Sequence, residues 1–160
     1  MSAATTSLKQ ISEFFAQKRI AMVGVSRDPK DFTRILYAEF KKRGYDIIPV
    51  NPNLSDLDGQ RAYARVQDIK PGVDGVLVVT PSKATDQVVR DCAEAGVTRV
   101  WLHRGEGIGS VSDQAVTFCQ EHGINVVVGH CPFMFLPQTP FFHKIHGYVK
   151  KLTGSYPVSN

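Results

Sequence analysis

Short apolar runs alternate along this chain with segments of helical periodicity, and this alternation constrains the fold more than any other feature. Five runs have the length and composition of strands that are buried on both faces. They span residues 20–23, 45–50, 75–79, 99–102 and 125–128. Apolar residues recur at helical spacing in segments 31–43, 82–95 and 112–122, each followed by glycine. Strands and helices that alternate in this way predict a parallel sheet with helices on both faces.

The remaining segments complete a single domain. Ser7 and Gln10 form a capping-box pattern at the start of a helix that is predicted to run to Lys18 and to cover a sheet edge. Between the second and third strands we expect a polar loop over 53–59 and a brief strand over 62–64. A chain of 160 residues has the size of one domain. We therefore expect one α/β domain, an open Rossmann-like parallel sheet of about five or six strands.

The first predicted strand ends in a turn that is suited to phosphate. In an open parallel sheet, ligands bind beyond the carboxyl ends of the strands, where the strand order reverses. Gly24 allows close approach of the backbone, Ser26 supplies a hydroxyl, and the following helix is expected to present free amides and a positive dipole end. Arg27 and Lys30 can add positive charge. The alternative interpretation is a tight turn that binds no ligand.

Two patterns that are absent narrow the choice of nucleotide. A dinucleotide fingerprint requires glycines where Ser26 and Pro29 stand, and an acidic residue at the end of the second strand, where the chain has Asn51 and Pro52. The first turn also lacks the Gly-Lys-Ser/Thr end of a P-loop. NAD and nucleoside triphosphate hydrolysis are therefore disfavoured.

Five segments, in a specific order and spacing, carry a family resemblance. They are IAMVGVSRDP at 20–29, IPVNP at 48–52, DGQRAY at 58–63, AGVTRVWL at 95–102 and CP at 131–132. Together they resemble the small CoA-binding-domain proteins, which are related to the nucleotide-binding domain of the succinyl-CoA synthetase alpha subunit. The resemblance implies that the ligand is CoA or acyl-CoA, and it runs from about Arg19 to Pro132. The synthetases' phosphorylated histidine lies in a further domain, so the resemblance does not imply synthetase activity.

The resemblance also implies which residues hold each part of the ligand. It places the diphosphate at the first turn, the adenosine near the end of the second strand, and the pantetheine arm past the third. The cofactor-binding residues predicted are Gly24, Val25, Ser26, Arg27, Lys30, Asn51, Pro52, Thr80, Pro81, His103 and Cys131. The chain departs from the family pattern near the thiol end, with His103 where glutamine is usual and Phe135 where an acidic residue is usual.

His103 and Cys131 are the candidates for chemistry. No carboxylate partner is placed with His103, so a binding role is favoured over acid–base catalysis. Cys131 lies on the predicted ligand side, where a mixed disulfide with CoA or a redox-sensing role is conceivable, but a plain buried thiol is favoured. Cys92 and Cys119 lie on apolar helix faces and are predicted to be core residues.

We therefore expect a CoA-binding or acyl-CoA-binding protein without catalytic machinery of its own. The second interpretation is a nucleotide-dependent enzyme or redox sensor that uses Cys131 or His103 on a bound CoA or NAD(P). A third is a purely structural partner subunit. No metal site is predicted, although His143 and His146 on a terminal helix could in principle join His130 and Cys131.

Charge and composition limit the partners. Residues 1–50 contain nine Lys or Arg against five acids, and the rest contain ten against ten, so the net charge of +4 lies early. This asymmetry fits either a small polyanionic ligand or an ordinary solvated surface. Basic residues are not interleaved with exposed aromatics, so nucleic acid is not expected.

The expected setting is cytoplasmic. The start of the chain has no long apolar run, so neither a signal peptide nor membrane association is expected. Three widely spaced cysteines fit a reducing compartment. The sequence leaves a homo-oligomer possible. The expected organisation is an N-terminal helical extension at 1–18, a CoA-binding domain at 19–137, and a C-terminal helix and tail at 138–160, with Thr139-Pro140 opening that helix.

Overall fold

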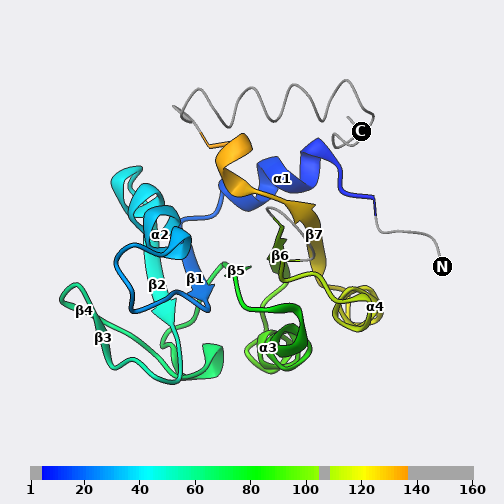
Figure 1. The fold of residues 1–160 in the computed structure, drawn as a ribbon. Coiled ribbons are helices and arrows are strands. Elements are labelled where there is room, and N and C mark those ends of the chain that lie inside the picture. The colour runs from blue at the N-terminus through cyan, green and yellow to red at the C-terminus, as the bar shows by residue number, and fades with distance from the viewer. Residues whose placement is uncertain (1–4, 105–108, 137–160) are drawn as a thin grey trace.

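Five parallel strands form the central sheet of the computed structural model, which describes residues 5–104 and 109–136. The strands are β1 (Arg19–Val23), β2 (Asp46–Val50), β5 (Gly75–Val78), β6 (Arg99–His103) and β7 (Asn125–His130). Their order across the sheet is β2-β1-β5-β6-β7 (Figure 1). The chain adds β2 on one side of β1 and then crosses to β5 on the other, so the strand order reverses between β1 and β5.

Within residues 5–104 and 109–136, four helices cover the two faces of the sheet, as predicted. Helices α1 (Leu8–Phe15) and α2 (Phe32–Lys42) lie on one face, and α3 (Ser82–Glu94) and α4 (Asp113–Glu121) lie on the other (Figure 1). The capping box at α1 is confirmed, because Ser7 and Gln10 each bind the other's backbone amide. This helix packs against β6 and β7, and Gln10 reaches Asn125 on the edge strand. The Rossmann-like α/β fold is thus confirmed.

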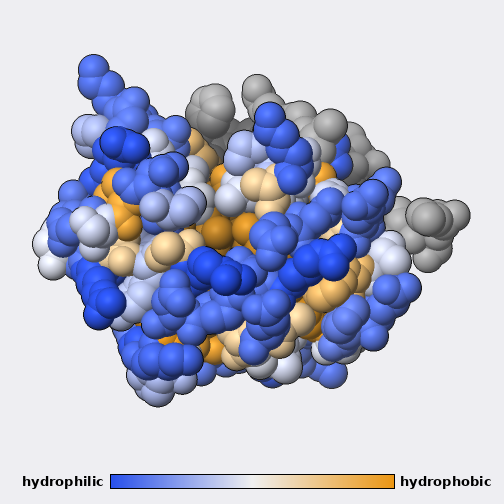
Figure 2. Space-filling model, turned by 90° about the horizontal axis from the view of Figure 1, so that it is seen from below, coloured by the Kyte–Doolittle hydropathy of each residue, from blue (hydrophilic) through white to orange (hydrophobic). Residues whose placement is uncertain are grey.

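Alternate side chains of each strand enter the two halves of the core. In β1, Ile20 and Met22 pack with α1 and α2, whereas Ala21 and Val23 pack with α3. Trp101 of β6 is fully buried beneath α1. Figure 2, which looks from below toward the side of α3 and α4, shows a mainly hydrophilic surface with smaller apolar areas near its middle. Within the described residues, no helix is long and apolar enough to cross a membrane.

The segment between β2 and β5 differs from the prediction. A small antiparallel hairpin, β3 (Asp56–Leu57) and β4 (Gln60–Arg61), replaces part of the expected polar loop. The brief strand expected over 62–64 is only a single parallel bridge, from Tyr63 to Val50. Two 3₁₀ turns, η1 (Val66–Asp68) and η2 (Pro132–Met134), follow the hairpin and β7. The predicted terminal helix lies outside the described residues.

Candidate functional site

The carboxyl ends of the five strands bring the predicted site residues to one edge of the sheet. Val23 pairs with Val50 on one side and with Val78 on the other, so these three strand ends are level. At or just beyond the five ends, in sheet order, lie Asn51, Gly24, Thr80, His103 and Cys131. Open parallel α/β sheets bind ligands at the point where the strand order reverses. In this sheet that point lies between Gly24 and Thr80.

Gly24 and Thr80 touch at the point of reversal. The φ angle of Gly24 is +100°, a conformation that side chains other than glycine rarely adopt. A Cβ atom at this position would lie 2.8 Å from both the backbone N and Cγ2 of Thr80. The turn therefore requires glycine both for its backbone angle and for the close approach of the neighbouring strand end.

Asn51 holds the first turn in place. Its Nδ2 donates to the carbonyl of Val25 at 2.9 Å, and its Oδ1 accepts from the Asn53 amide at 2.8 Å. Val25 is fully buried as a whole residue, so neither its side chain nor its backbone is exposed at this turn. Pro52, the next residue, is exposed. The end of β2 thus positions the turn as well as bordering it.

The start of α2 is not the open anion site that the sequence suggested. Asp31 caps this helix, and its Oδ1 accepts from the amide of Thr33 at 2.8 Å and from the hydroxyl of Thr33 at 2.6 Å. The Thr33 hydroxyl oxygen in turn accepts from the amide of Ser26 at 2.9 Å. The expectation of free amides at this helix start is therefore wrong for Thr33, and a carboxylate lies beside the turn.

The start of α3 has no such cap. Pro81 precedes the helix, and no side chain of the described residues caps it. Thr80 lies just before it, with its hydroxyl within 3.2 Å of the Thr85 hydroxyl and its carbonyl accepting from Ser110 Oγ. Uncapped first-turn amides carry the positive end of the helix dipole. The open helix start next to the strand-order reversal is therefore that of α3.

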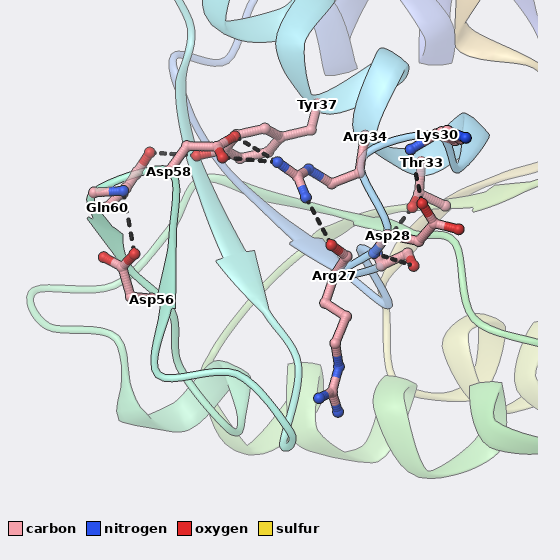
Figure 3. Close-up of polar contacts among 11 residues, drawn as sticks. Arg27, Asp28, Lys30, Thr33, Arg34, Tyr37, Asp56, Asp58 and Gln60 are labelled. Atoms are coloured by element: carbon pink, nitrogen blue, oxygen red, sulfur yellow. Dashed lines mark hydrogen bonds and ion pairs between the residues drawn. The ribbon is translucent and has the colours of Figure 1, made fainter.

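Arg34 links the first turn to the β3–β4 hairpin, a connection that the sequence did not reveal. Its Nη1 donates to the carbonyl of Arg27 at 3.1 Å, and its Nη2 contacts both carboxylate oxygens of Asp58 at 2.7 and 2.8 Å (Figure 3). The side chains of Arg27 and Lys30 are themselves exposed, and that of Arg27 extends away from this cluster. The side chains of Arg27 and Lys30 are thus accessible at the turn, while Arg34 holds the backbone of the turn.

Tyr37 makes a second link between α2 and the hairpin. Its hydroxyl donates to Gln60 Oε1, and Gln60 Nε2 donates to the carbonyl of Ile47 at 2.7 Å. Burial, with the nearby Asp58 carboxylate, raises the pKa of Tyr37 to about 12. The hydroxyl therefore stays protonated and keeps its role as a donor across the physiological pH range.

His103 ends β6 as a neutral imidazole. Burial lowers its pKa to about 4. Its Nε2 is shielded from solvent and has no hydrogen-bond partner among the described residues. The ring of Phe32, the first residue of α2, lies 5.5 Å from the imidazole ring. A neutral ring with an unused polar atom favours binding over acid–base chemistry at neutral pH.

The cysteines are core residues. Cys92 and Cys119 are fully buried, and burial raises the pKa of both thiols, that of Cys119 to about 11. Cys131 is 8% exposed and packs in the core half that contains α1 and α2. Among the described residues, no three His, Cys, Asp or Glu side chains form a group that could hold a metal. His143 and His146 lie outside those residues.

A separate open hollow of about 590 Å³ lies away from this edge, between the ends of α1 and α2. It is lined by residues 15–18 and 42–45. None of the predicted site residues lines it, so the candidate site remains the carboxyl edge of the sheet.

The fold, with its polar strand ends at one edge of the sheet, is a Rossmann-like α/β domain, and comparison with known proteins gives its family. The family model described as "CoA binding domain" matches residues 18–137, three quarters of the chain. This chain therefore belongs to the CoA-binding-domain family.

Three relatives illustrate the family. The alpha subunit of the ADP-forming acetate–CoA ligase II of Pyrococcus furiosus is 28% identical over 74% of this chain, which spans only 27% of that subunit's length. The uncharacterized protein YneT of Bacillus subtilis is 29% identical over 71% of this chain and 82% of its own length. A hypothetical protein of Pyrococcus horikoshii is 26% identical, with a TM-score of 0.72 over 82% of this chain and 94% of its own.

Proposed function

We propose that this protein binds CoA or an acyl-CoA along the carboxyl edge of its sheet and has no catalytic machinery of its own. The observation that carries the proposal is the close contact of Gly24 with Thr80 at the strand-order reversal. Ligands of open α/β sheets bind at this point. Membership of the CoA-binding-domain family supports CoA as the ligand.

Several hydrogen-bond donors and cations near the first turn are available to bind the diphosphate. The backbone amide of Arg27, an exposed residue, donates to no other group of the described residues. The Ser26 hydroxyl accepts from the Asp28 amide at 3.0 Å and keeps its own proton to donate. The exposed cations and the uncapped start of α3 add positive potential.

The rest of the ligand follows the sheet order in both directions from this turn. The adenosine lies toward the end of β2, near Asn51 and Pro52. The pantetheine arm runs past Thr80 and Pro81 at the end of β5, and the thiol end lies toward the ends of β6 and β7. The burial of Cys131 supports a bound, unmodified CoA rather than a mixed disulfide.

Ligand-induced stabilisation tests this function directly. CoA at 100 times its Kd is expected to raise the free energy of unfolding by about 2.7 kcal/mol, because only the folded state binds it. NAD at the same concentration is expected to leave the Tm unchanged. Differential scanning calorimetry of the full chain measures both. If neither CoA nor an acyl-CoA shifts the Tm, the nucleotide-binding function is wrong.

Native mass spectrometry distinguishes the second interpretation. A CoA-sized adduct that persists in the presence of a reductant supports non-covalent binding. An adduct that the reductant removes shows a mixed disulfide, and a Cys131→Ser variant then identifies the thiol involved. That result would favour the redox-sensing role over simple binding.

Removing the charge of Asp31 is expected to tighten CoA binding. Asn caps a helix about as well as Asp, so Asp31→Asn keeps the helix start while deleting a carboxylate beside the diphosphate. We expect a decrease in Kd of about three- to tenfold, since the interaction of two charges a few ångströms apart near a surface is about 1 kcal/mol or more. Isothermal titration calorimetry measures the change.

Asp46→Asn is the matched control for this prediction. It makes the same change in net charge at the amino end of β2, where Asp46 pairs with Arg19 on the surface. The control should leave the Kd of CoA unchanged. Equal effects of the two substitutions, or no effect of Asp31→Asn, would place the diphosphate away from α2.

A further inference from the structure

Three rings meet beyond the end of β6, and we call them the ring cluster: Phe32, His103 and Phe133. The Phe32 ring centroid lies 5.5 Å from the imidazole of His103 and 5.5 Å from the ring of Phe133. These residues come from three separate elements, namely α2, β6 and η2. The cluster follows the first turn directly, because Phe32 is flanked by Asp31 and by Thr33, which binds the Ser26 amide.

The ring cluster is apolar except for the imidazole of His103. Phe133 is buried, and residues 131–136 contain no charged side chain. The only polar group of the three rings is the imidazole, whose Nε2 is shielded from solvent without a partner among the described residues. A buried polar atom without a partner costs free energy unless a ligand or water satisfies it. The imidazole is also uncharged at neutral pH, because burial holds its pKa near 4.

Phe32 is the exposed member of the ring cluster. Its side chain is 38% exposed, at the first position of α2, whereas most aromatic side chains of this half of the core are buried. Exposed side chains exchange rotamers within nanoseconds. We therefore expect rotation of the Phe32 side chain to open the ring cluster toward solvent. The neighbouring Arg104 is exposed and passes beside Gly129 of β7, with its Cδ 3.7 Å from where a Cβ of Gly129 would lie.

We propose that the ring cluster binds the acyl group of a short, uncharged acyl-CoA, with His103 Nε2 donating to the thioester carbonyl and the two phenylalanines contacting the acyl carbons. This inference rests on the proposed function, which places the thiol end of CoA toward β6 and β7. It goes further by choosing acyl-CoA over free CoA and by stating the class of acyl group.

The chemistry of the cluster sets its specificity. Apolar acyl carbons gain free energy on contact with Phe32 and Phe133 because they leave water. A second carboxylate, as in a succinyl group, would enter an apolar site where a neutral imidazole offers it no opposite charge. Free CoA has no carbonyl at this position and leaves Nε2 without its partner. We therefore expect butyryl-CoA to bind more tightly than either CoA or succinyl-CoA.

Titration calorimetry of the full chain with CoA, butyryl-CoA and succinyl-CoA tests the inference. We expect wild-type protein to bind butyryl-CoA at least tenfold more tightly than CoA. Phe32→Ala and His103→Leu should reduce this ratio to threefold or less. His103→Gln keeps a donor near the position of Nε2 and should retain most of the ratio. Ile35→Ala, which truncates another exposed apolar side chain of α2, should leave the ratio unchanged.

The outcomes separate this inference from the proposed function. The ring cluster is not the acyl site if wild-type protein binds butyryl-CoA and CoA with nearly equal affinity. The same conclusion follows if the preference for butyryl-CoA persists in both Phe32→Ala and His103→Leu. Equal affinities for succinyl-CoA and butyryl-CoA also overturn it. If no CoA compound binds at all, the proposed function itself fails. The fluorescence of the single, buried Trp101 confirms that each variant is folded.

Discussion

Alanine at position 24 is expected to destabilise the protein by about 2–6 kcal/mol and to abolish CoA binding. The backbone angle of +100° costs about 1–3 kcal/mol for a residue with a side chain. The overlap of the new Cβ with the Thr80 backbone adds about 1–3 kcal/mol, because packed interiors yield little. Urea unfolding measures the first effect and calorimetric titration the second.

Gly44→Ala is the matched control. Gly44 also has a positive φ, +86°, but a Cβ there would meet nothing within 4 Å. Gly44→Ala should therefore lower the free energy of unfolding only by the cost of the backbone angle, and CoA binding should persist. A double variant, Gly24→Ala with Thr80→Ser, removes the Cγ2 overlap but not the backbone overlap, so little recovery is expected. A Gly24→Ala protein as stable as Gly44→Ala would contradict the close approach of the two strand ends.

Trp101→Ala is expected to cost about 3–5 kcal/mol, the range for truncating a large buried aromatic side chain. Trp101 is fully buried in β6, and its ring lies 5.3 Å from the rings of Phe14 and Phe15 of α1. Its Nε1 donates to the carbonyl of His130 at 2.8 Å. The substitution therefore removes both the packing between α1 and the sheet and a link between the ends of β6 and β7.

Trp101→Phe separates these two contributions. Phenylalanine keeps most of the ring contacts but has no N–H, so the loss should be smaller, about 1–2 kcal/mol for the hydrogen bond. Urea unfolding followed by circular dichroism measures both variants. A cost below about 1 kcal/mol for Trp101→Ala would show that α1 contributes little to the core.

The sequence predicts the main architecture because each strand and helix is marked locally. Strands buried on both faces appear as apolar runs, and helices begin and end at residues with recognisable roles, such as Ser7. The parallel pairing then follows from the alternation. The element ends differ from the prediction by a few residues, and β7 continues to His130 beyond the predicted Val128.

The hairpin β3–β4 was missed because its strands are only two residues long and show no periodicity. A local signal was nevertheless present. Asp58 and Gly59 both have positive φ, 50° and 81°, and Asp-Gly is a favoured pair for such hairpin turns. The polar residues on either side of this dipeptide favour a loop, and they hide the signal of the turn.

The contacts around the first turn could be predicted only in part. The Gly24 turn is marked by its position after a buried strand. Asp31 followed by Thr33 is a local capping pattern, which is enough to predict that the start of α2 is closed. The link from Arg34 to Asp58 joins residues 24 positions apart, and no local pattern marks such a pair. Positions that depend on packing between distant segments therefore require the structure.

The order of the strands has a consequence for the length of ligand that this edge can recognise. Neighbouring strands lie about 4.8 Å apart, so five strand ends span roughly 19 Å. In the binding mode proposed above, CoA extends along all five of these ends. In that mode each strand end contacts a different portion of CoA, and the number of strands limits the length of ligand that the edge can contact. A strand added or removed at one edge of the sheet would then change this length and leave the Gly24 turn unchanged.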